Sequence, residues 1–204
     1  MLTPAEESLY LNAGQLLLHD VSVVLFDTGM RPEECHRMRW EQVTWLNGRH
    51  GTIRIAHGKT KAARRTLPMT PRVRGVLDAR WIMAGKPEKG WVWPAETKDD
   101  HINHDSRKAL RLSRVRPFEV YCIRHTFHTR LGESGCDVWT LAKIAGHSNI
   151  AISARYVHPS GDAVLRAMDR QAESGTGSKS GSNALEMPSD TLSVAALNPS
   201  TATV

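Results

Sequence analysis

The stretch YCIRHTFHTRLGESG, residues 121–135, carries the strongest signal of fold and function in this chain of 204 residues. It predicts a helix over about residues 118–133, because Gly135 is typical of a helix end. Four polar or amphipathic side chains recur at helical spacings and so share one face: Tyr121, Arg124, His125 and His128. Such a stripe is not typical of a helix that only packs against a core, so we expect part of a functional site here.

A metal site is one alternative for this helix. Cys122, His125 and His128 follow one another at spacings of three, and all are metal-ligand types. Structural zinc takes four ligands, and no matching Cys/His pair accompanies them, although HINH at 101–104 could supply two more histidines. The pattern favours a site without metal.

A second stretch, AGHSNIAISARYVHP at residues 145–159, places His147 nine positions before Tyr156. Ser148 is suited to cap a short helix, and we expect that helix to carry Tyr156. A single tyrosine on a helix is more often a packing residue than a reactive one. The chemistry of Tyr156 therefore depends on the groups that the fold brings to it.

Local signals divide the N-terminal part of the chain into helices. Thr3 and Glu6 form a capping box that predicts an N-terminal helix. A more apolar segment follows and should form a buried helix that ends near Gly29. Pro32 then opens another helix, which leaves Arg31 on a tight turn between the two.

The remainder predicts a mixed but mainly helical fold. Residues 51–69 are typical of a β-hairpin with a basic tip. Further elements are expected at these places: helices over 71–85, 98–113, 138–145 and 162–173, and a short strand at 91–94. The expected fold class is α+β, mainly helical, with a small antiparallel sheet. We expect a folded domain over residues 1–172 and a disordered tail over 173–204, rich in Ser, Thr, Gly and Ala.

Composition indicates a polyanionic partner. The net charge of +6 makes nucleic acid the first candidate. The three cysteines are too few, and odd in number, for a disulfide framework, which favours a reducing compartment. The sequence shows neither a signal peptide nor an apolar run long enough for a membrane span, so we expect a cytoplasmic, nucleoid-associated protein.

Two basic runs favour nucleic acid further. No acidic residue lies between Glu41 and Asp78, and this interval includes the basic residues of the hairpin: Lys59, Lys61, Arg64 and Arg65. The second run, RKALRLSRVR, begins with Arg107, Lys108 and Arg111. Either run could be a solvated surface, but two of them favour contacts with a phosphate backbone, which are salt-sensitive and carry no base specificity.

Five motifs occur in a fixed order: TGMRPEE, GKTKAARRTLP, YCIRHTFHTRLGESG, LAKIAGHSNI and ARYVH. Together they resemble the catalytic domain of the tyrosine recombinases, the phage-integrase family, over about residues 3–160. The resemblance implies a DNA breaking-rejoining core that performs site-specific recombination or integration through a 3′-phosphotyrosyl intermediate, without a cofactor. It also implies double-stranded DNA as the partner, a homo-oligomer (a tetramer) on that DNA, and accessory DNA-bending proteins.

The resemblance also assigns roles to the phosphate-binding residues. Arg31 and Arg124 are similar to the two arginines that hold the non-bridging oxygens of the scissile phosphate. Glu34 matches an acidic position that supports the site. His125 matches the histidine that directly follows the second arginine.

The remaining roles concern proton transfer and attack. Lys59 resembles the hairpin lysine that protonates the leaving 5′ oxygen, and Lys61 is a rival because the hairpin varies in length. His147 resembles a later histidine that donates a hydrogen bond to phosphate. Tyr156 resembles the nucleophile.

Tyr121 departs from the family pattern. The usual motif is His-x-x-Arg, and that histidine is credited with helping to deprotonate the nucleophile. A tyrosine can donate a hydrogen bond but is a poor base near neutral pH, because its pKa is about 10. Tyr121 is also a rival nucleophile by residue type, although its place before Arg124 argues against that role. The identity of the base is left open.

Family members usually carry a further N-terminal, core-binding helical domain, and the resemblance does not include it. We therefore expect a fragment or a shortened product that by itself binds DNA weakly. Two alternatives to recombination are a truncated, non-cleaving remnant that binds DNA or a partner, and a type IB-like topoisomerase reaction.

Overall fold

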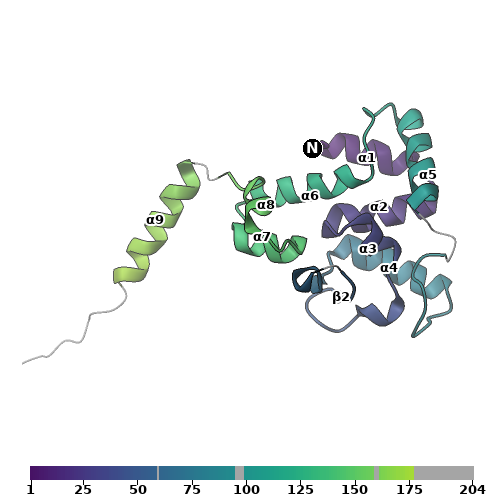
Figure 1. The fold of residues 1–204 in the computed structure, drawn as a ribbon, viewed down its shortest axis with the longest axis horizontal. Coiled ribbons are helices and arrows are strands. Elements are labelled where there is room, and N and C mark those ends of the chain that lie inside the picture. The colour runs from purple at the N-terminus through teal and green to yellow at the C-terminus, as the bar shows by residue number, and fades with distance from the viewer. Residues whose placement is uncertain (59, 95–98, 159–160, 177–204) are drawn as a thin grey trace, which may run out of the picture. The chain divides into compact units, whose positions relative to one another are not determined.

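The computed structural model describes residues 1–58, 60–94, 99–158 and 161–176 (Figure 1). The chain divides into two units, Met1–Ala163 and Val164–Val204. The helices run as follows: α1 Pro4–Ala13, α2 Leu16–Thr28, α3 Pro32–His36, α4 Pro71–Met83, α5 Asp99–Ser113, α6 Tyr121–Glu133, α7 Val138–Ala145, α8 Ile150–Ala154 and α9 Gly161–Thr176. The strands are β1 Val43–Thr44, β2 Thr52–Ile55 and β3 Arg65–Pro68, and two 3-10 turns lie at Trp40–Gln42 and Lys61–Ala63. The fold is mainly helical with a small antiparallel sheet, as the sequence predicts.

Helix α1 begins at the expected capping box. The Glu6 amide donates to Thr3 Oγ1 (3.2 Å), and the Thr3 amide donates to the Glu6 carboxylate (2.7 Å). At the other end of the helix, the buried Tyr10 hydroxyl donates to Ser106 Oγ on α5 (2.8 Å), so α1 and α5 pack together. The Leu2 amide donates to Thr126 Oγ1 (3.1 Å), which joins the N-terminal segment to α6.

Helix α2 is the centre of the core. Val21, Val24 and Leu25 have no exposed surface, and the helix packs against both α4 and α6. It ends at Gly29, as predicted, with a left-handed φ of 60° and a bond from its amide to the Leu25 carbonyl (3.0 Å). A Cβ at Gly29 would lie 2.1 Å from the Phe127 ring, so glycine also permits the close approach of α6.

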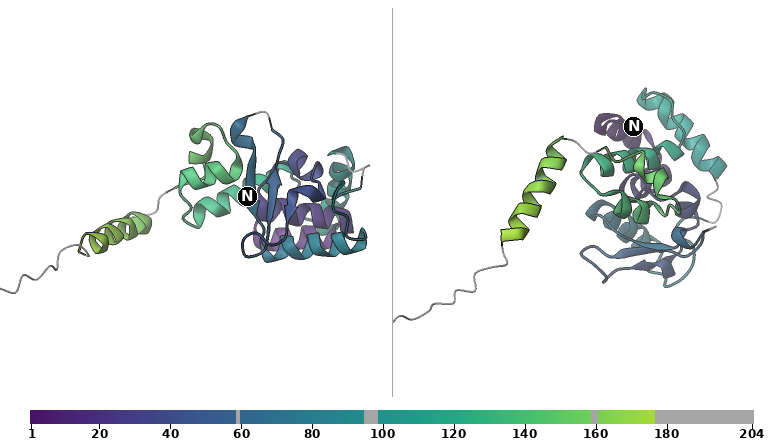
Figure 2. Two further views of the ribbon diagram at one scale, coloured as in Figure 1. Left: turned by 90° about the horizontal axis from the view of Figure 1, so that it is seen from below. Right: turned by 60° about the vertical axis from the view of Figure 1, so that its left-hand side comes forward.

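The sheet has the strand order β1-β2-β3, and all its pairs are antiparallel. Strands β2 and β3 form the predicted hairpin, with Ile53 opposite Leu67 and Ile55 opposite Arg65. The strand expected at 91–94 is reduced to a single bridge between Trp91 and Arg39. Figure 2 shows the hairpin beside the helices of the 121–154 segment, and α7 contacts β3.

The segment from α6 to α8 follows the sequence closely, with two differences. Gly135 (φ 88°) closes α6 and Asp137 caps α7, accepting from the Trp139 and Thr140 amides at 2.9 Å, as predicted. The cap of α8 is Asn149, not Ser148, because Asn149 Oδ1 reaches the Ala151 amide (2.9 Å). The helix also ends at Ala154, so Tyr156 lies in the turn just beyond it instead of on the helix.

Helix α9 extends through Thr176, so the expected boundary at residue 172 lies within it. The rest of the expected tail, residues 177–204, is outside the described residues. No helix in the described ranges is both long and apolar enough to cross a membrane. Cys35, Cys122 and Cys136 all carry free thiols.

We expect Gly29→Ala to destabilise the protein, because the left-handed conformation alone costs an L-residue about 1–2 kcal/mol and the new methyl group must also displace Phe127. Urea unfolding measures the loss. Gly75→Ala is the matched control, since a Cβ at this exposed position in α4 meets open space and should stabilise the helix by about 0.5–1 kcal/mol. Equal midpoints for the two variants would contradict the close packing of α6 on Gly29.

Candidate active site

Arg124 is the buried centre of the candidate site. Its residue is only 2% exposed, and its guanidinium donates to the carbonyls of Gly29 (2.6 Å) and Ala145 (2.7 Å). These carbonyls lie at the C-terminal ends of α2 and α7, where the helix dipole is negative and favours a cation. Burial, and then the nearby charge of Arg31, lower the pKa of Arg124 to about 10, so the side chain stays charged at neutral pH.

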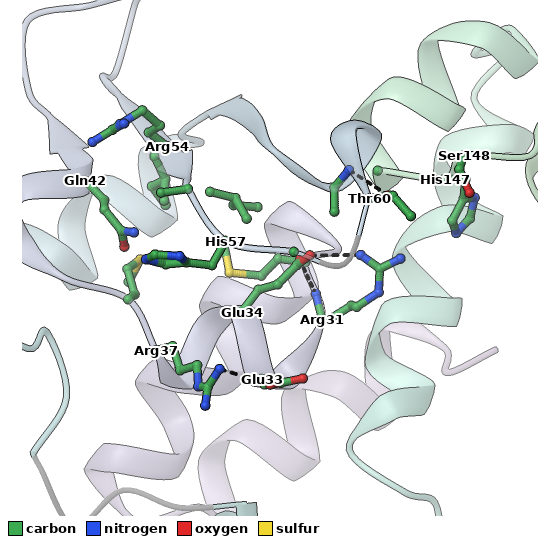
Figure 3. A pocket seen from close by; sticks show the side chains of 18 of the residues that line it. Arg31, Glu33, Glu34, Arg37, Gln42, Arg54, His57, Thr60, His147 and Ser148 are labelled. Atoms are coloured by element: carbon green, nitrogen blue, oxygen red, sulfur yellow. Dashed lines mark hydrogen bonds and ion pairs between the residues drawn. The ribbon is translucent and has the colours of Figure 1, made fainter.

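Arg31 and Glu34 form the second part of the site, at the start of α3 (Figure 3). The Arg31 guanidinium donates to one Glu34 oxygen and its amide to the other, both at 2.8 Å. Burial would raise the pKa of Glu34, but the hydrogen bonds and charge of Arg65 and the bonds from Arg31 outweigh it and hold the pKa below its usual value. The Arg31 side chain is still one-third exposed, so it is fixed in place yet accessible to a ligand.

Arg65 has a different place from that expected of a DNA contact. Its side chain is 5% exposed and makes a two-pronged ion pair with Glu34 (3.0 and 2.9 Å). Its Nε donates to the Ile144 carbonyl on α7 (2.6 Å) and Nη1 to the Ala63 carbonyl (2.8 Å). With these donors occupied, the geometry argues against phosphate binding and for a role in joining β3 to α3 and α7.

His147 is neutral at physiological pH, because burial and then Arg124 lower its pKa to about 4. Its Nε2 lies 3.1 Å from an Arg124 guanidinium nitrogen, which can only donate, so Nε2 is the acceptor. The ring proton is therefore on Nδ1, which donates to Ser153 Oγ at 2.8 Å. Ser153 is buried in α8, and no sequence signal identified it as a partner of His147.

Tyr156 lies along one face of α6. A Cβ at Gly132 would be 1.8 Å from the Tyr156 carbonyl oxygen, so the absence of a side chain at Gly132 lets the backbone of Tyr156 touch the helix. One turn earlier the His128 ring centroid is 5.3 Å from the tyrosine ring, and a further turn earlier His125 Nδ1 is 2.6 Å from the Tyr156 hydroxyl. Burial raises the pKa of Tyr156, although Arg124 opposes the rise.

Two other side chains of α6 surround this tyrosine. Tyr121 is 44% exposed, and its ring meets the His125 ring edge-on at 5.2 Å. His128 is fully buried, and burial, then Arg124, lowers its pKa to about 2. The three side chains considered as metal ligands do not assemble, since no group of three or more His, Cys, Asp or Glu in the described ranges could hold a metal ion.

A pocket of about 700 Å³ opens beside these groups (Figure 3). It is lined by α3, the β2–β3 hairpin and the turn at 146–148, and includes Arg31, Thr60 and His147. Gly146 shapes this turn with a φ of 67°, and a Cβ there would lie 2.7 Å from the Arg65 guanidinium. The pocket thus brings together residues from three of the five sequence motifs.

The other expected site residues lie on the surface or outside the described ranges. Lys59, the expected acid, is outside them. Lys61 lies in the 3-10 turn of the hairpin and is exposed, as are the remaining expected DNA contacts: Arg64, Arg107, Lys108 and Arg111. The last three lie on α5, which contributes no residue to the pocket lining.

A family model, the phage integrase family, matches residues 12–162, so the chain belongs to the phage-integrase (tyrosine recombinase) family. Tyrosine recombinase XerD of Brucella suis is 26% identical over 157 residues, covering 70% of this chain and 48% of that protein. A XerC-like tyrosine recombinase of Caldanaerobacter subterraneus is 27% identical over 173 residues, covering 67% and 44%. The chain thus spans about half the length of these relatives.

Solved structures show the same fold. The catalytic domain of bacteriophage HP1 integrase aligns with a TM-score of 0.64 at 17% identity, covering 85% of this chain and 96% of that one. XerA recombinase aligns with a TM-score of 0.66 at 20% identity, covering 84% and 62%. XerH, bound to its difH substrate before cleavage, aligns with a TM-score of 0.64 at 17% identity, covering 82% and 53%.

We expect Arg65→Ala to destabilise the fold by about 3–5 kcal/mol, because it leaves Glu34 buried with one partner fewer. Arg64→Ala, next to it but exposed, should leave the unfolding midpoint unchanged. The same two variants separate a structural role from DNA binding. Arg64→Ala should weaken DNA binding and reduce the slope of log K against log salt concentration by about 1. A loss of stability in Arg64→Ala equal to that in Arg65→Ala would contradict this division.

Proposed function

We propose that this chain cleaves and rejoins DNA strands in site-specific recombination, with Tyr156 as the nucleophile. One observation carries the proposal. On helix α6, His125 lies within hydrogen-bond distance of the Tyr156 hydroxyl. The adjacent residue of the same helix is the buried cation Arg124, which donates to His147. An attacking phenol and a cationic, preorganised anion site are what a phosphodiester requires.

The phosphate-binding part would consist of Arg31 and Arg124. Among the described residues, Glu34 is the one carboxylate bonded to both Arg31 and Arg65, and Arg124 is bonded to carbonyls and a histidine. Positive charge therefore exceeds negative charge among these four side chains. The scissile phosphate would offset the excess. An anion beside His147 would also raise its pKa, and protonation at Nε2 would convert it from an acceptor into the expected donor.

The leaving group would be protonated from the hairpin. Lys59 and Lys61 remain the candidates for this acid, and Thr60 between them reaches the pocket. Lys61 and Arg64, with Arg107, Lys108 and Arg111 on α5, would contact the phosphate backbone on either side. Solved relatives support DNA as the partner, since XerH is bound to its difH substrate and the Tn1549 transposon integrase is in complex with transposon right-end DNA.

Assembly and reaction outcome are part of the same proposal. We propose that the chain acts as a homo-oligomer, a tetramer when two duplexes are exchanged, with accessory DNA-bending proteins. Tyr121, in place of the family's histidine, favours one alternative, a non-cleaving DNA-binding protein. A type IB-like relaxation would use the same residues and differ in the strand that is rejoined.

A duplex with a nick near the cleavage site tests the proposal, because loss of a short fragment prevents rejoining and traps the covalent intermediate. We expect a protein–DNA adduct on denaturing gels that is abolished in Tyr156→Phe and retained in Tyr121→Phe. An adduct that survives in Tyr156→Phe but vanishes in Tyr121→Phe would reverse the assignment. No adduct with the unaltered protein, at any salt concentration that permits DNA binding, would favour the non-cleaving alternative.

Gly132→Ala should uncouple DNA binding from cleavage. The methyl group would overlap the Tyr156 carbonyl and push the nucleophile away from α6, while Arg31, Arg124 and the surface cations keep their places. Misplacement by about 1 Å can cost on the order of 10²-fold in rate. We expect a loss of that size in the adduct-forming rate, with DNA affinity retained. Gly135→Ala is not a clean control because its φ is 88°, so Gly75→Ala serves again.

A further inference from the structure

We propose that His125 is the general base that takes the proton of Tyr156. The inference rests on the proposed function and deepens it, because it names the group that replaces the histidine missing at position 121. The direct observation is the 2.6 Å separation between His125 Nδ1 and the Tyr156 hydroxyl. This lies within the 2.6–3.2 Å reach that a general base needs.

The environment of His125 keeps it in the basic form. Burial, then Arg124 and the N-terminal amino group, lower its pKa, so the imidazole is neutral at pH 7 and one ring nitrogen holds a free lone pair. The residue is exposed overall, and Nδ1 is the nitrogen beside the phenol. The tautomer that can act has its proton on Nε2, with Nδ1 accepting from Tyr156.

The other candidates are placed less well. His147 uses Nε2 to accept from Arg124 and Nδ1–H to donate to Ser153. His128 packs against the tyrosine ring, but neither of its ring nitrogens has a hydrogen-bond partner among the described residues. Tyr121 is no base near neutral pH, and its edge-on contact with the His125 ring instead holds that ring in orientation.

The O–H bond of Tyr156 breaks and its proton moves to His125 Nδ1, while the phenolic oxygen forms a bond to phosphorus. The bond from phosphorus to the 5′ oxygen breaks, and that oxygen takes a proton from the hairpin acid. In rejoining, a 5′ hydroxyl attacks phosphorus and gives its proton back to the deprotonated hairpin group. The bond from phosphorus to the phenolic oxygen breaks, and the imidazolium of His125 returns its proton to the departing phenolate.

The first test is the single-turnover cleavage rate of His125→Gln on the nicked duplex. Glutamine keeps a polar group near the phenol but cannot take its proton. We expect cleavage to slow about 10²–10⁴-fold, the usual contribution of a general base, with DNA affinity unchanged. His19→Gln, at a partly exposed histidine paired with Asp20 on α2, is the matched control and should cleave at the normal rate. An unchanged rate in His125→Gln would overturn the proposal.

The pH profile and the leaving group distinguish a base from a positioning residue. The unaltered protein should lose rate as the pH falls through the pKa of His125, because the imidazole then carries a proton, and His125→Gln should lack that limb. The titratable and charged groups that act on His125 are Arg124, the N-terminal amino group, Tyr121, Tyr156, His128 and His147. A substrate with sulfur in place of the bridging 5′ oxygen needs no acid, so the His125→Gln defect should persist on it. Rescue by sulfur would instead assign His125 to the leaving group.

A third measurement is independent of cleavage. Nitrogen-15 NMR of the DNA-free protein reports the tautomer of His125, and we expect the Nε2–H form, with its population reduced in Tyr156→Phe. A dominant Nδ1–H form would overturn the proposal, because His125 would then donate to Tyr156 and could not accept from it. Absence of an adduct with the unaltered protein would refute the proposed function and with it a catalytic role for His125, whereas the tautomer reports separately whether Nδ1 accepts from Tyr156.

Discussion

The buried guanidinium of Arg124 is the interaction on which the site depends. A charge in the interior is costly unless hydrogen bonds compensate it, and here the compensation comes from the carbonyls that end α2 and α7. Partial charges at helix ends are weaker than a carboxylate, so Arg124 is satisfied without being neutralised. The cluster therefore keeps an excess of positive charge, shared with Arg31, at a place where an anion fits. The packing that holds the helices together thus also creates the positive charge that the proposed phosphate site needs.

Glycine makes this geometry possible at three points where segments of the chain approach one another closely. Gly29 admits Phe127 and presents its carbonyl to Arg124, Gly146 turns the chain beside Arg65, and Gly132 admits the backbone of Tyr156. Each contact brings a different element to α6 or to the hairpin. A larger residue at any of these glycines would move one part of the site relative to the others. The three glycines therefore help to set the distances between Tyr156, the cations Arg31 and Arg124, and the pocket.

Local features of the fold could be read from sequence, because a few neighbouring residues determine them. The Thr3–Glu6 capping box, the end of α6 at Gly135 and the Asp137 cap are examples, and the hairpin follows from its alternation. Features that depend on distant residues could not. Arg65 is basic and lies in a basic run, yet it is buried against Glu34, 31 positions away. The exit of Tyr156 from α8 and its bond to His125, across 31 positions, have no local signature either.

The geometry of one helix places His125, the proposed base, beside the Tyr156 hydroxyl. His125, His128 and Gly132 are spaced by three and four residues and share a face, and Tyr156 runs along that face from its backbone at Gly132 to its hydroxyl at His125. Position 121 lies one further turn along α6, and the ring of Tyr121 contacts that of His125. The residue within hydrogen-bond distance of the phenol is His125. A tyrosine at position 121 is then compatible with the proposed cleavage reaction. The residue beside the Tyr156 hydroxyl is His125, whose ring Tyr121 contacts, and not the residue at position 121.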